Sequence, residues 1–463
     1  MIRLFRVFVP VGALTLLVSE VILLAASFVL ATYIVLTVDP RIYLLYDGGW
    51  LRITVVLVSI LIGLHFHDLY SQIHVTSRVL LLQQLCLVVG VAFLLQGLIS
   101  YLDPYLRVPI RVMVLGSAIS VLVVFGWRIF FSRYAMLVMG RDRLLMVGDS
   151  PLLADIGVYI DEHPATGLVV AGYLGDAYET GTPLPGGKVL GGMNALRAVV
   201  TATHPNRIIV GMTDRRSRVP VADLLELRFA GHIIEEAASA YERICGRVCV
   251  KELRPSQLIY SGELGPRRQN VIYQTIANLL SASLGIVLSF PLMLLTAVAV
   301  RLSSPGPILY RQQRVGLDGV PFTVYKFRSM RADAEAATGA VWAARHDPRV
   351  TAVGRVIRKI RFDELPQLFN VLKGDMSIVG PRPERPEFVK TFVESIPYYS
   401  QRHSVRPGIT GWAQINYKYG DTLQDTIYKL EYDLYYIKNM SLSLDSYIIF
   451  HTVKAMLLSR GAQ

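Results

Sequence analysis

The sequence predicts a membrane protein of mixed α plus α/β class, in which a helical bundle is followed by two α/β parts. Apolar residues make up 52% of its 463 residues, and its mean hydropathy is positive, which exceeds the usual share for a soluble chain. Four apolar stretches crowd the first 135 residues, and strand and helix patterns alternate after them. We therefore expect three domains, at residues 1–135, 143–255 and 270–463.

The four apolar stretches predict a four-helix transmembrane bundle. They run over residues 7–36, 51–64, 79–102 and 108–129. All but the second approach the roughly 20 residues that span a bilayer as a helix. The first is too long for the apolar part of a signal peptide, so we expect no cleaved leader.

Basic residues predict that both ends of this bundle face the cytoplasm, because loops on that side carry an excess of arginine and lysine. These residues are Arg3, Arg6, Arg128, Arg133, Arg141 and Arg143. Glu20 lies inside the first stretch, where an ionisable side chain is costly. A functional role and a contact within the bundle are both open for Glu20.

Residues 143–255 show the pattern of a Rossmann-like domain. "RLLMVGD" reads as a strand, "PLLADIGVYIDE" as the following helix, and "GLVVAGYLGD" and "PNRIIVGM" as two further strands. A dinucleotide site needs glycines that let backbone amides approach a pyrophosphate, but Asp149, Ser150 and Pro151 follow Gly148. We expect a regulatory or packing domain whose nucleotide pocket is degenerate.

The chain has three cysteines, Cys86, Cys245 and Cys249. They form no paired framework and match no zinc spacing. We expect buried thiols in a reducing compartment.

A fifth apolar stretch, at residues 276–300, has a proline, Pro291, near its middle. Proline removes a helical hydrogen bond and bends the helix. Arginines flank the stretch on both sides, which favours a segment that enters the membrane and turns back. A kinked helix that crosses the membrane remains the alternative.

The part after this stretch begins with a predicted hairpin and continues with a short helix. "ILYRQQRVGLDGVPFTVYKFRSM" alternates apolar and polar residues around a glycine-containing turn, with Lys326 and Arg328 on its second arm. In the helix, the sequence predicts one apolar stripe and a stop at Gly374. The stripe consists of Leu365, Leu368, Phe369 and Leu372.

Asp363 and Glu364 lie side by side at the start of this helix. Such a pair is often only a helix cap, favoured by the helix dipole. The surroundings favour a site for phosphates and a divalent ion, because guanidinium groups bind phosphate oxygens in pairs and Mg²⁺ takes one or two carboxylates with substrate phosphates. The neighbouring basic residues are Arg358, Lys359, Arg361, Arg382, Arg385 and Arg406. With a net charge of +12, a basic face beside anionic lipid is also expected.

Three blocks of sequence resemble the bacterial sugar transferase family, the polyprenyl-phosphate phosphoglycosyl transferases. They are "YKFRSM", "DELPQLFNVLKGDMSIVGPRPE" and "VRPGITGWAQINY". The resemblance covers about residues 270–463. The preceding parts look like the larger members, the undecaprenyl-phosphate glucose or galactose phosphotransferases and the sugar transferases of exopolysaccharide clusters. The resemblance implies a small catalytic domain anchored by a re-entrant membrane helix. The turn of this helix would be formed by Ser289, Phe290 and Pro291.

The resemblance implies a reaction in two steps at the cytoplasmic face of the inner membrane. Asp363 would attack the β-phosphate of a UDP-sugar, release UMP and carry the phosphosugar, which undecaprenyl phosphate would then accept. The cofactor would be Mg²⁺, held by Asp363. Glu364 would assist Asp363. The substrate-binding residues would be Lys326, Arg328, Arg358, Gln367, Asn370, Arg382 and Arg406, with Arg358 addressing the polyprenyl phosphate.

Two other function classes stay in view. One is an NAD-dependent enzyme acting on a nucleotide sugar, against which the missing glycine pattern argues. The other is a non-catalytic membrane scaffold for polysaccharide assembly. Nucleic-acid binding would explain the charge but not the apolar stretches, so we expect no nucleic-acid partner. The sequence leaves open the sugar, the polysaccharide pathway and whether the chain forms a homodimer.

Overall fold

The protein is described by a computed structural model. It describes residues 2–4, 7–9, 11–67, 69–70, 78–135, 142–212, 220–250, 265, 268–331, 334, 347, 349–417 and 422–457. The chain divides into two compact units, Met1–Leu4 with Phe8–Ala237 and Phe5–Val7 with Ala238–Gln463. The described part is mostly helical, and five of its helices are long and apolar enough to cross a membrane.

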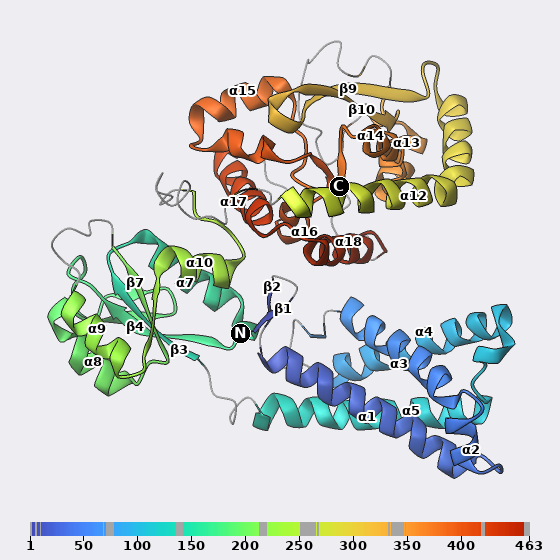
Figure 1. Ribbon diagram of the computed structural model, residues 1–463, viewed down its shortest axis with the longest axis horizontal. Helices are drawn as coiled ribbons and strands as arrows, with labels where there is room; N and C mark the ends of the chain where they lie inside the picture. Colours follow the sequence, from blue (N-terminus) through green and yellow to red (C-terminus); the bar gives the residue numbers. More distant parts are fainter. Residues whose placement is uncertain are drawn as a thin grey trace. The chain divides into compact units, whose positions relative to one another are not determined.

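Four of these helices pack against one another in the first unit (Figure 1). They are α1 Val11–Val35, α3 Gly49–Phe66, α4 Arg78–Leu102 and α5 Ile110–Phe130. Phe28, Val56 and Val112 form part of their shared core, whereas Leu94 and Leu122 are exposed. Apolar residues on the outside as well as the inside are what a lipid environment requires. Shorter segments are α2 Pro40–Leu45, Pro104–Leu106 and Phe131–Ala135.

Two details of the predicted stretches change. The first stretch was expected to be helical from Val7, but Val7–Val9 form strand β2, which pairs with β1, Ile2–Leu4. The helix begins at Val11, directly after Pro10. Proline disfavours the helical conformation in the residue before it, which explains the later start. The second stretch, which looked too short, is extended at both ends to the 18 residues of α3.

Glu20 makes a charged contact between the helices. It is fully buried in α1, and its carboxylate pairs with Arg128 of α5, with 2.6 Å between Oε1 and Nε. Tyr70 donates a hydrogen bond of 2.7 Å to Glu20 Oε2, and Arg128 Nη1 donates one of 2.8 Å to the carbonyl of Leu69. Both charges are therefore matched by polar partners within the first unit, which favours the contact over a separate functional role.

Replacing Glu20 by leucine is expected to destabilise the first unit by about 3–5 kcal/mol, because the buried guanidinium of Arg128 would lose its counter-charge. The double replacement Glu20→Leu with Arg128→Met should recover most of this loss, since no unpaired charge remains. The measurement is the thermal unfolding of the purified protein in detergent. Equal losses in the single and double variants would show that the charges do not depend on each other.

The middle part of the first unit contains a six-stranded sheet in the order β5-β6-β4-β3-β7-β8. All neighbouring strands are parallel except β5 with β6. Without β5, the strands in chain order lie as 3-2-1-4-5, the order of a Rossmann-type half. The strands are β3 Asp142–Gly148, β4 Leu168–Leu174, β5 Pro183–Leu184, β6 Gly187–Gly191, β7 Arg207–Gly211 and β8 Ile233–Glu236. The helices are α7 Pro151–Glu162, α8 Leu196–Thr203 and α9 Val221–Phe229. Helix α10, Ala237–Cys245, follows them, and all of it after Ala237 belongs to the second unit.

The predicted strands β3, β4 and β7 and the predicted helix α7 are confirmed, and β5, β6 and β8 were not foreseen. At the end of β3, where a dinucleotide would bind, the backbone at Gly148 lies in close contact with the backbone at Gly211. A Cβ atom on Gly148 would lie 1.8 Å from the carbonyl oxygen of Gly211. Ser150 donates its backbone N–H to that same oxygen, and its hydroxyl accepts the N–H of Leu152 in the first turn of α7. These contacts favour a packing role for this end of the sheet.

The second unit contains the hairpin β9 Leu309–Val315 with β10 Pro321–Phe327, as predicted, and a parallel pair, β11 Ser377–Val379 with β12 Gly408–Thr410. Helices surround these strands (Figure 1). Buried tyrosines of the C-terminal helices, among them Tyr435 and Tyr436, form the core. The helices are α12 Arg268–Ser303, α13 Ala352–Lys359, α14 Gln367–Lys373, α15 Pro386–Ser395, α16 Trp412–Asn416, α17 Leu423–Asn439 and α18 Leu442–Leu457.

The long helix α12 bends, and both of its arms pack against other elements of the second unit. It has 36 residues with Pro291 inside, and Figure 1 shows its two arms running in different directions. On the first arm, Gln274 donates hydrogen bonds of 2.7 Å to the hydroxyl of Tyr436 and 2.9 Å to Asp445. On the second arm, Val300 packs in one cluster with residues of β10 and α13.

Helix α10 contacts α17 within the second unit, and Arg247, which follows α10, lies near three tyrosine rings. The guanidinium of Arg247 lies 4.9 to 5.5 Å from the ring centres of Tyr241, Tyr428 and Tyr432. Tyr241 donates a hydrogen bond of 2.9 Å to Glu431 of α17. The end of the middle domain was predicted at residue 255, which lies outside the described residues, whereas Ala238 and the residues after it cluster with the second unit.

The prediction of three buried thiols is wrong for Cys86, which is exposed on α4, while Cys245 and Cys249 are buried. All three are free thiols. Because α4 is apolar on every side, its sequence does not reveal which face packs against the other helices.

Candidate active site

Asp363 and Glu364 lie in a single helical turn, Phe362–Glu364, between α13 and α14. The turn follows Arg361, whose backbone adopts a left-handed conformation with φ of +61°. Helix α14 begins just after it and ends at Gly374, so the predicted position of the pair and the predicted stop are confirmed. The residue that precedes α14, Pro366, provides no side-chain cap. The cap explanation for the two carboxylates is therefore not supported.

Glu364 is the anchored member of the pair. Its Oε1 accepts hydrogen bonds from Lys326 Nζ at 3.0 Å and from Arg382 Nη2 at 2.8 Å. Burial raises the pKa of Glu364, but the charges of Lys326, Arg382 and Arg361 outweigh this effect and hold the pKa well below its usual range. Glu364 thus stays ionised and fixes two cations from β10 and from the 380–385 loop.

Asp363 has the opposite character. The residue is 9% exposed, and its Oδ1 is buried without a hydrogen-bond partner among the described residues. Burial, and then the charge of Glu364, raise the pKa of Asp363 to about 6, against the opposing charges of Lys326, Arg361 and Arg358. Two adjacent carboxyl groups with diverging pKa values are typical of a site where they have different tasks.

The 380–385 loop, which contains Arg382, is held by a close approach of two backbone segments. Gly380 donates its N–H to the carbonyl of Thr410 at 2.9 Å, and Gly408 donates to that of Pro381 at 2.9 Å. A Cβ atom on Gly408 would lie 2.1 Å from the nitrogen of Gly380, and one on Gly411 2.3 Å from its carbonyl oxygen. Only glycine fits there. The "GPRP" and "PGITG" motifs are therefore two halves of one structure that orients Arg382.

Asn370 fastens α14 to the strand that bears Lys326. It is fully buried, and its side-chain amide donates to the carbonyl of Thr323 at 2.7 Å and accepts the N–H of Tyr325 at 3.1 Å. Gln367, one turn earlier, is also buried. A contact of these two residues with substrate stays a prediction.

Arg328 and Arg406 hold α12 and the loop after it. Arg328 donates to the carbonyl of Pro305 at 2.6 Å and to that of Ser304 at 2.7 Å. Arg406 donates to the hydroxyl of Thr275 on the first arm of α12 at 3.0 Å. Their observed contacts are structural, and their predicted contacts with substrate stay predictions. Arg358, in the last turn of α13, lies near enough for its charge to lower the pKa of Asp363.

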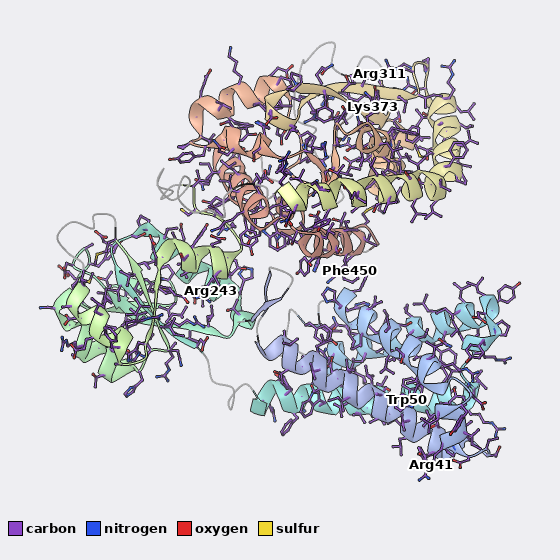
Figure 2. All side chains as sticks on the ribbon, viewed as in Figure 1. Arg41, Trp50, Arg243, Arg311, Lys373 and Phe450 are labelled. Atoms are coloured by element: carbon purple, nitrogen blue, oxygen red, sulfur yellow. The ribbon has the colours of Figure 1, made fainter. Side chains whose placement is uncertain are left out.

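The apolar stripe predicted for α14 faces the protein interior only in part: Leu365 and Leu368 pack against buried residues, whereas Phe369 and Leu372 are exposed. Phe369 is 44% exposed and Leu372 is 37% exposed, whereas Gln367, Asn370 and Val371 are buried. The prediction was wrong for Phe369 and Leu372 because Gln367 and Asn370 occupy the buried side of the helix, where Asn370 binds backbone groups of β10; the spacing of apolar residues does not reveal such contacts. On the same helix, Lys373 lies 5.9 Å from the ring of Tyr325, and Arg311 of β9 lies at the same distance from it. Figure 2 labels both cations.

Two supports of the 380–385 loop were not foreseen. Arg314 of β9 donates to the carbonyl of Pro383 at 3.0 Å, and Arg402 donates to that of Arg382 at 3.0 Å. Arg402 also forms a buried ion pair with Asp433 of α17 at 2.8 Å. The signal was an acid within the apolar run "LEYDLYYI", because a buried carboxylate needs a partner.

The residues of the site fit a magnesium ion shared with a phosphate substrate. Among the described residues, no group of three or more His, Cys, Asp or Glu gathers as a metal site. Magnesium is often held by one or two carboxylates and completed by phosphate oxygens and water. The unpartnered Oδ1 of Asp363 is a suitable ligand of this kind.

The chain is similar to known proteins. Residues 269–459 match the family described as bacterial sugar transferase. The chain is 49% identical over 222 residues to the UDP-N-acetylgalactosamine-undecaprenyl-phosphate N-acetylgalactosaminephosphotransferase of Aeromonas hydrophila, which covers 48% of this chain and 52% of that protein. It is 34% identical over 339 residues to the UDP-glucose:undecaprenyl-phosphate glucose-1-phosphate transferase of Xanthomonas campestris pv. campestris, covering 69% and 68%. The protein of the same name from Escherichia coli is 44% identical over 195 residues, covering 42% of each chain.

Proposed function

Because the chain belongs to the bacterial sugar transferase family, we propose that it transfers a sugar 1-phosphate from a UDP-sugar to undecaprenyl phosphate and releases UMP. The observation that carries the proposal is the contrast within the carboxylate pair. Asp363 presents an oxygen that has no hydrogen-bond partner in the part of the chain that the structure describes, while Lys326 and Arg382 hold Glu364 beside it. The product would start the assembly of an exopolysaccharide, a capsule or the O-antigen of lipopolysaccharide.

In the first step, a carboxylate oxygen of Asp363 attacks the β-phosphorus of the UDP-sugar. The new bond joins this oxygen to the β-phosphorus, the bond from the β-phosphorus to the bridging oxygen breaks, and UMP leaves with the electron pair. In the second step, a phosphate oxygen of undecaprenyl phosphate attacks the same phosphorus. The bond to Asp363 breaks, and its carboxylate is regenerated.

The other residues of the site bind and orient. Glu364 holds Lys326 and Arg382 next to Asp363, where their charges meet those of the diphosphate. Arg358 supplies a further positive charge on the side of α13, suited to the incoming lipid phosphate. Asp363 would hold magnesium, which when bound neutralises the diphosphate and stabilises the departing UMP.

A re-entrant α12 would bring this site to the cytoplasmic face, where UDP-sugars are made. As a straight helix its 36 residues would extend about 54 Å, yet both arms contact the same small unit. Around the bend, α12 exposes apolar side chains to its surroundings, as does α14 with Phe369. Those on α12 include Leu284, Val287, Leu288, Phe290 and Leu295. The helices α1, α3, α4 and α5 would form a four-helix transmembrane bundle in the inner membrane.

The re-entrant topology predicts that both ends of α12 lie on the cytoplasmic side. In a variant without its own cysteines, Gln269→Cys places one exposed thiol in the first turn of the helix and Asp318→Cys places one after it. Both thiols should react with a membrane-impermeant maleimide in inside-out vesicles. Neither thiol should react with it in intact cells. Labelling of the two thiols from opposite sides would instead establish a kinked crossing helix.

The direct test of the function is UMP release from a panel of UDP-sugars with membranes, Mg²⁺ and undecaprenyl phosphate. The panel includes UDP-glucose and UDP-N-acetylgalactosamine, which are named for the similar proteins. Release with one sugar, and transfer of that sugar's phosphate to the lipid, would support the proposal and identify the donor. Absence of release with every sugar would favour the scaffold.

A further inference from the structure

Arg402 and Asp433 form a buried ion pair behind the 380–385 loop. Asp433 Oδ2 accepts hydrogen bonds from Arg402 Nη2 at 2.8 Å and Nε at 3.1 Å. The side chains are 7% and 3% exposed. The remaining terminal nitrogen of Arg402, Nη1, donates to the hydroxyl of Tyr399 at 2.6 Å. The guanidinium is thus fixed on three sides.

The same guanidinium reaches the site. Arg402 Nη2 also donates to the backbone carbonyl of Arg382 at 3.0 Å, and the side chain of Arg382 binds Glu364 at 2.8 Å. An unbroken series of polar contacts therefore runs from Asp433 on α17 to the carboxylate beside Asp363. The next carbonyl in the loop, that of Pro383, is held by Arg314 at 3.0 Å.

We propose that Asp433 is a positioning residue for the transfer reaction: it fixes Arg402, which holds the backbone of Arg382 so that the side chain of Arg382 meets Glu364 and the substrate phosphates. The proposal rests on the proposed function for the substrate that Arg382 meets. Asp433 touches neither the dyad nor the substrate in this arrangement.

A buried ion pair need not serve stability, because well-packed apolar residues of similar volume often stabilise a core as much or more. An apolar pair would not hold a hydrogen-bond donor in a fixed direction toward the 380–385 loop. The planar guanidinium of Arg402 distributes its donors over Asp433, Tyr399 and the carbonyl of Arg382 at fixed angles. A displacement of about 1 Å at a reacting site can cost roughly 100-fold in rate, so this direction matters to catalysis.

The matched control is Glu431, two residues before Asp433 on the same helix and equally buried. Its carboxylate binds Tyr241 at 2.9 Å and the N–H of Val250 at 3.2 Å. These contacts of Glu431 connect α17 with α10 and with the segment after it. Asp433→Asn and Glu431→Gln therefore remove similar charges with different consequences.

The first measurement is hydrogen exchange of the full-length protein in detergent, without substrate. Asp433→Asn should speed exchange in peptides that contain residues 380–385, and Glu431→Gln should leave those peptides unchanged. Equal exchange in Asp433→Asn and the parent would overturn the proposal. If Asp433→Asn does not fold, Arg402→Lys is measured in its place. Lysine keeps the positive charge but lacks the planar guanidinium that donates to several partners at once.

The second measurement combines Asp433→Asn with Arg382→Ala in the UMP-release assay. Alone, Asp433→Asn should lower kcat about 10- to 100-fold. On the Arg382→Ala background it should lower kcat less than about threefold, because the group that it positions is gone. Equal losses on both backgrounds would mean that Asp433 acts on folding alone and would overturn the proposal. The two assays can also disagree. If Asp433→Asn speeds exchange at residues 380–385 but the parent protein releases no UMP, the proposed function is refuted, whereas the support of Arg382 by Asp433 still holds.

Discussion

Replacing Asp363 by asparagine is expected to abolish UMP release, with a loss of at least about 1000-fold in kcat. Asparagine keeps the size of the side chain but has no carboxylate oxygen to attack the β-phosphorus. Glu364 keeps both of its cations, so their contacts with the UDP-sugar should persist, while the loss of the proposed magnesium ligand should weaken the binding of the UDP-sugar. The measurements are UMP release and, for binding, displacement of a labelled nucleotide sugar.

The same replacement should stabilise the protein at neutral pH. The pKa of Asp363 is raised from 3.8 to about 6 in the folded state, so the folded state binds the proton more tightly than the unfolded state. Stability from this group is therefore present below about pH 4 and is lost as the pH rises to 6, in total about 2–3 kcal/mol. Asparagine avoids this loss, so the melting temperature at pH 7.5 should rise by several degrees, and the gain should vanish near pH 4.

Asp318→Asn is the control for this pair of effects. Asp318 lies exposed at the tip of the β9–β10 hairpin, in a left-handed conformation that asparagine also adopts. It should change neither UMP release nor the melting temperature. If Asp363→Asn kept more than about a tenth of the parent activity, the nucleophile would have to be sought elsewhere.

Much of the fold follows from local pattern. The alternation of "RLLMVGD" and "PLLADIGVYIDE" predicts β3 and α7, and the two arms around residues 316–319 predict the β9–β10 hairpin. The place of Asp363 and Glu364 before a helix follows from Pro366 and Gly374 in the same way. In these segments, neighbours in sequence decide the structure.

The site depends on contacts between distant segments, which no local pattern reveals. Asn370 binds backbone groups of β10 about 45 residues earlier in the chain, and Arg402 finds Asp433 across 31 residues. Glu20 and Arg128 are separated by 108 residues. A single sequence shows that such polar residues need partners, but not which partners they take.

The surroundings of the chain also changed the outcome. The exposed Phe369 and Leu372 and the exposed Cys86 were all expected inside, on the rule that apolar surface avoids water. That rule assumes an aqueous solvent. On α14, the polar residues Gln367 and Asn370 are buried against the protein instead.

The second large effect is expected from Glu364→Gln, which should lower kcat for UMP release about 100-fold. The neutral amide accepts hydrogen bonds from Lys326 and Arg382 more weakly than the carboxylate does, so these cations lose their fixed position beside Asp363. Lys326→Met and Arg382→Ala should each give part of this loss, because each removes one of the two cations.

Glu364→Gln should also move the pH at which activity is lost. Activity requires the ionised form of Asp363, so in the parent it should fall tenfold per pH unit below about pH 6. After burial, the negative charge of Glu364 is the largest cause of this raised pKa. Without it the pKa of Asp363 falls toward 3.8, and the remaining activity of the variant should persist to a lower pH than that of the parent. If the activity of Glu364→Gln still falls below about pH 6, the group that titrates there is not Asp363. If the fall in activity moves to a lower pH, the two carboxyl groups share one electrostatic site.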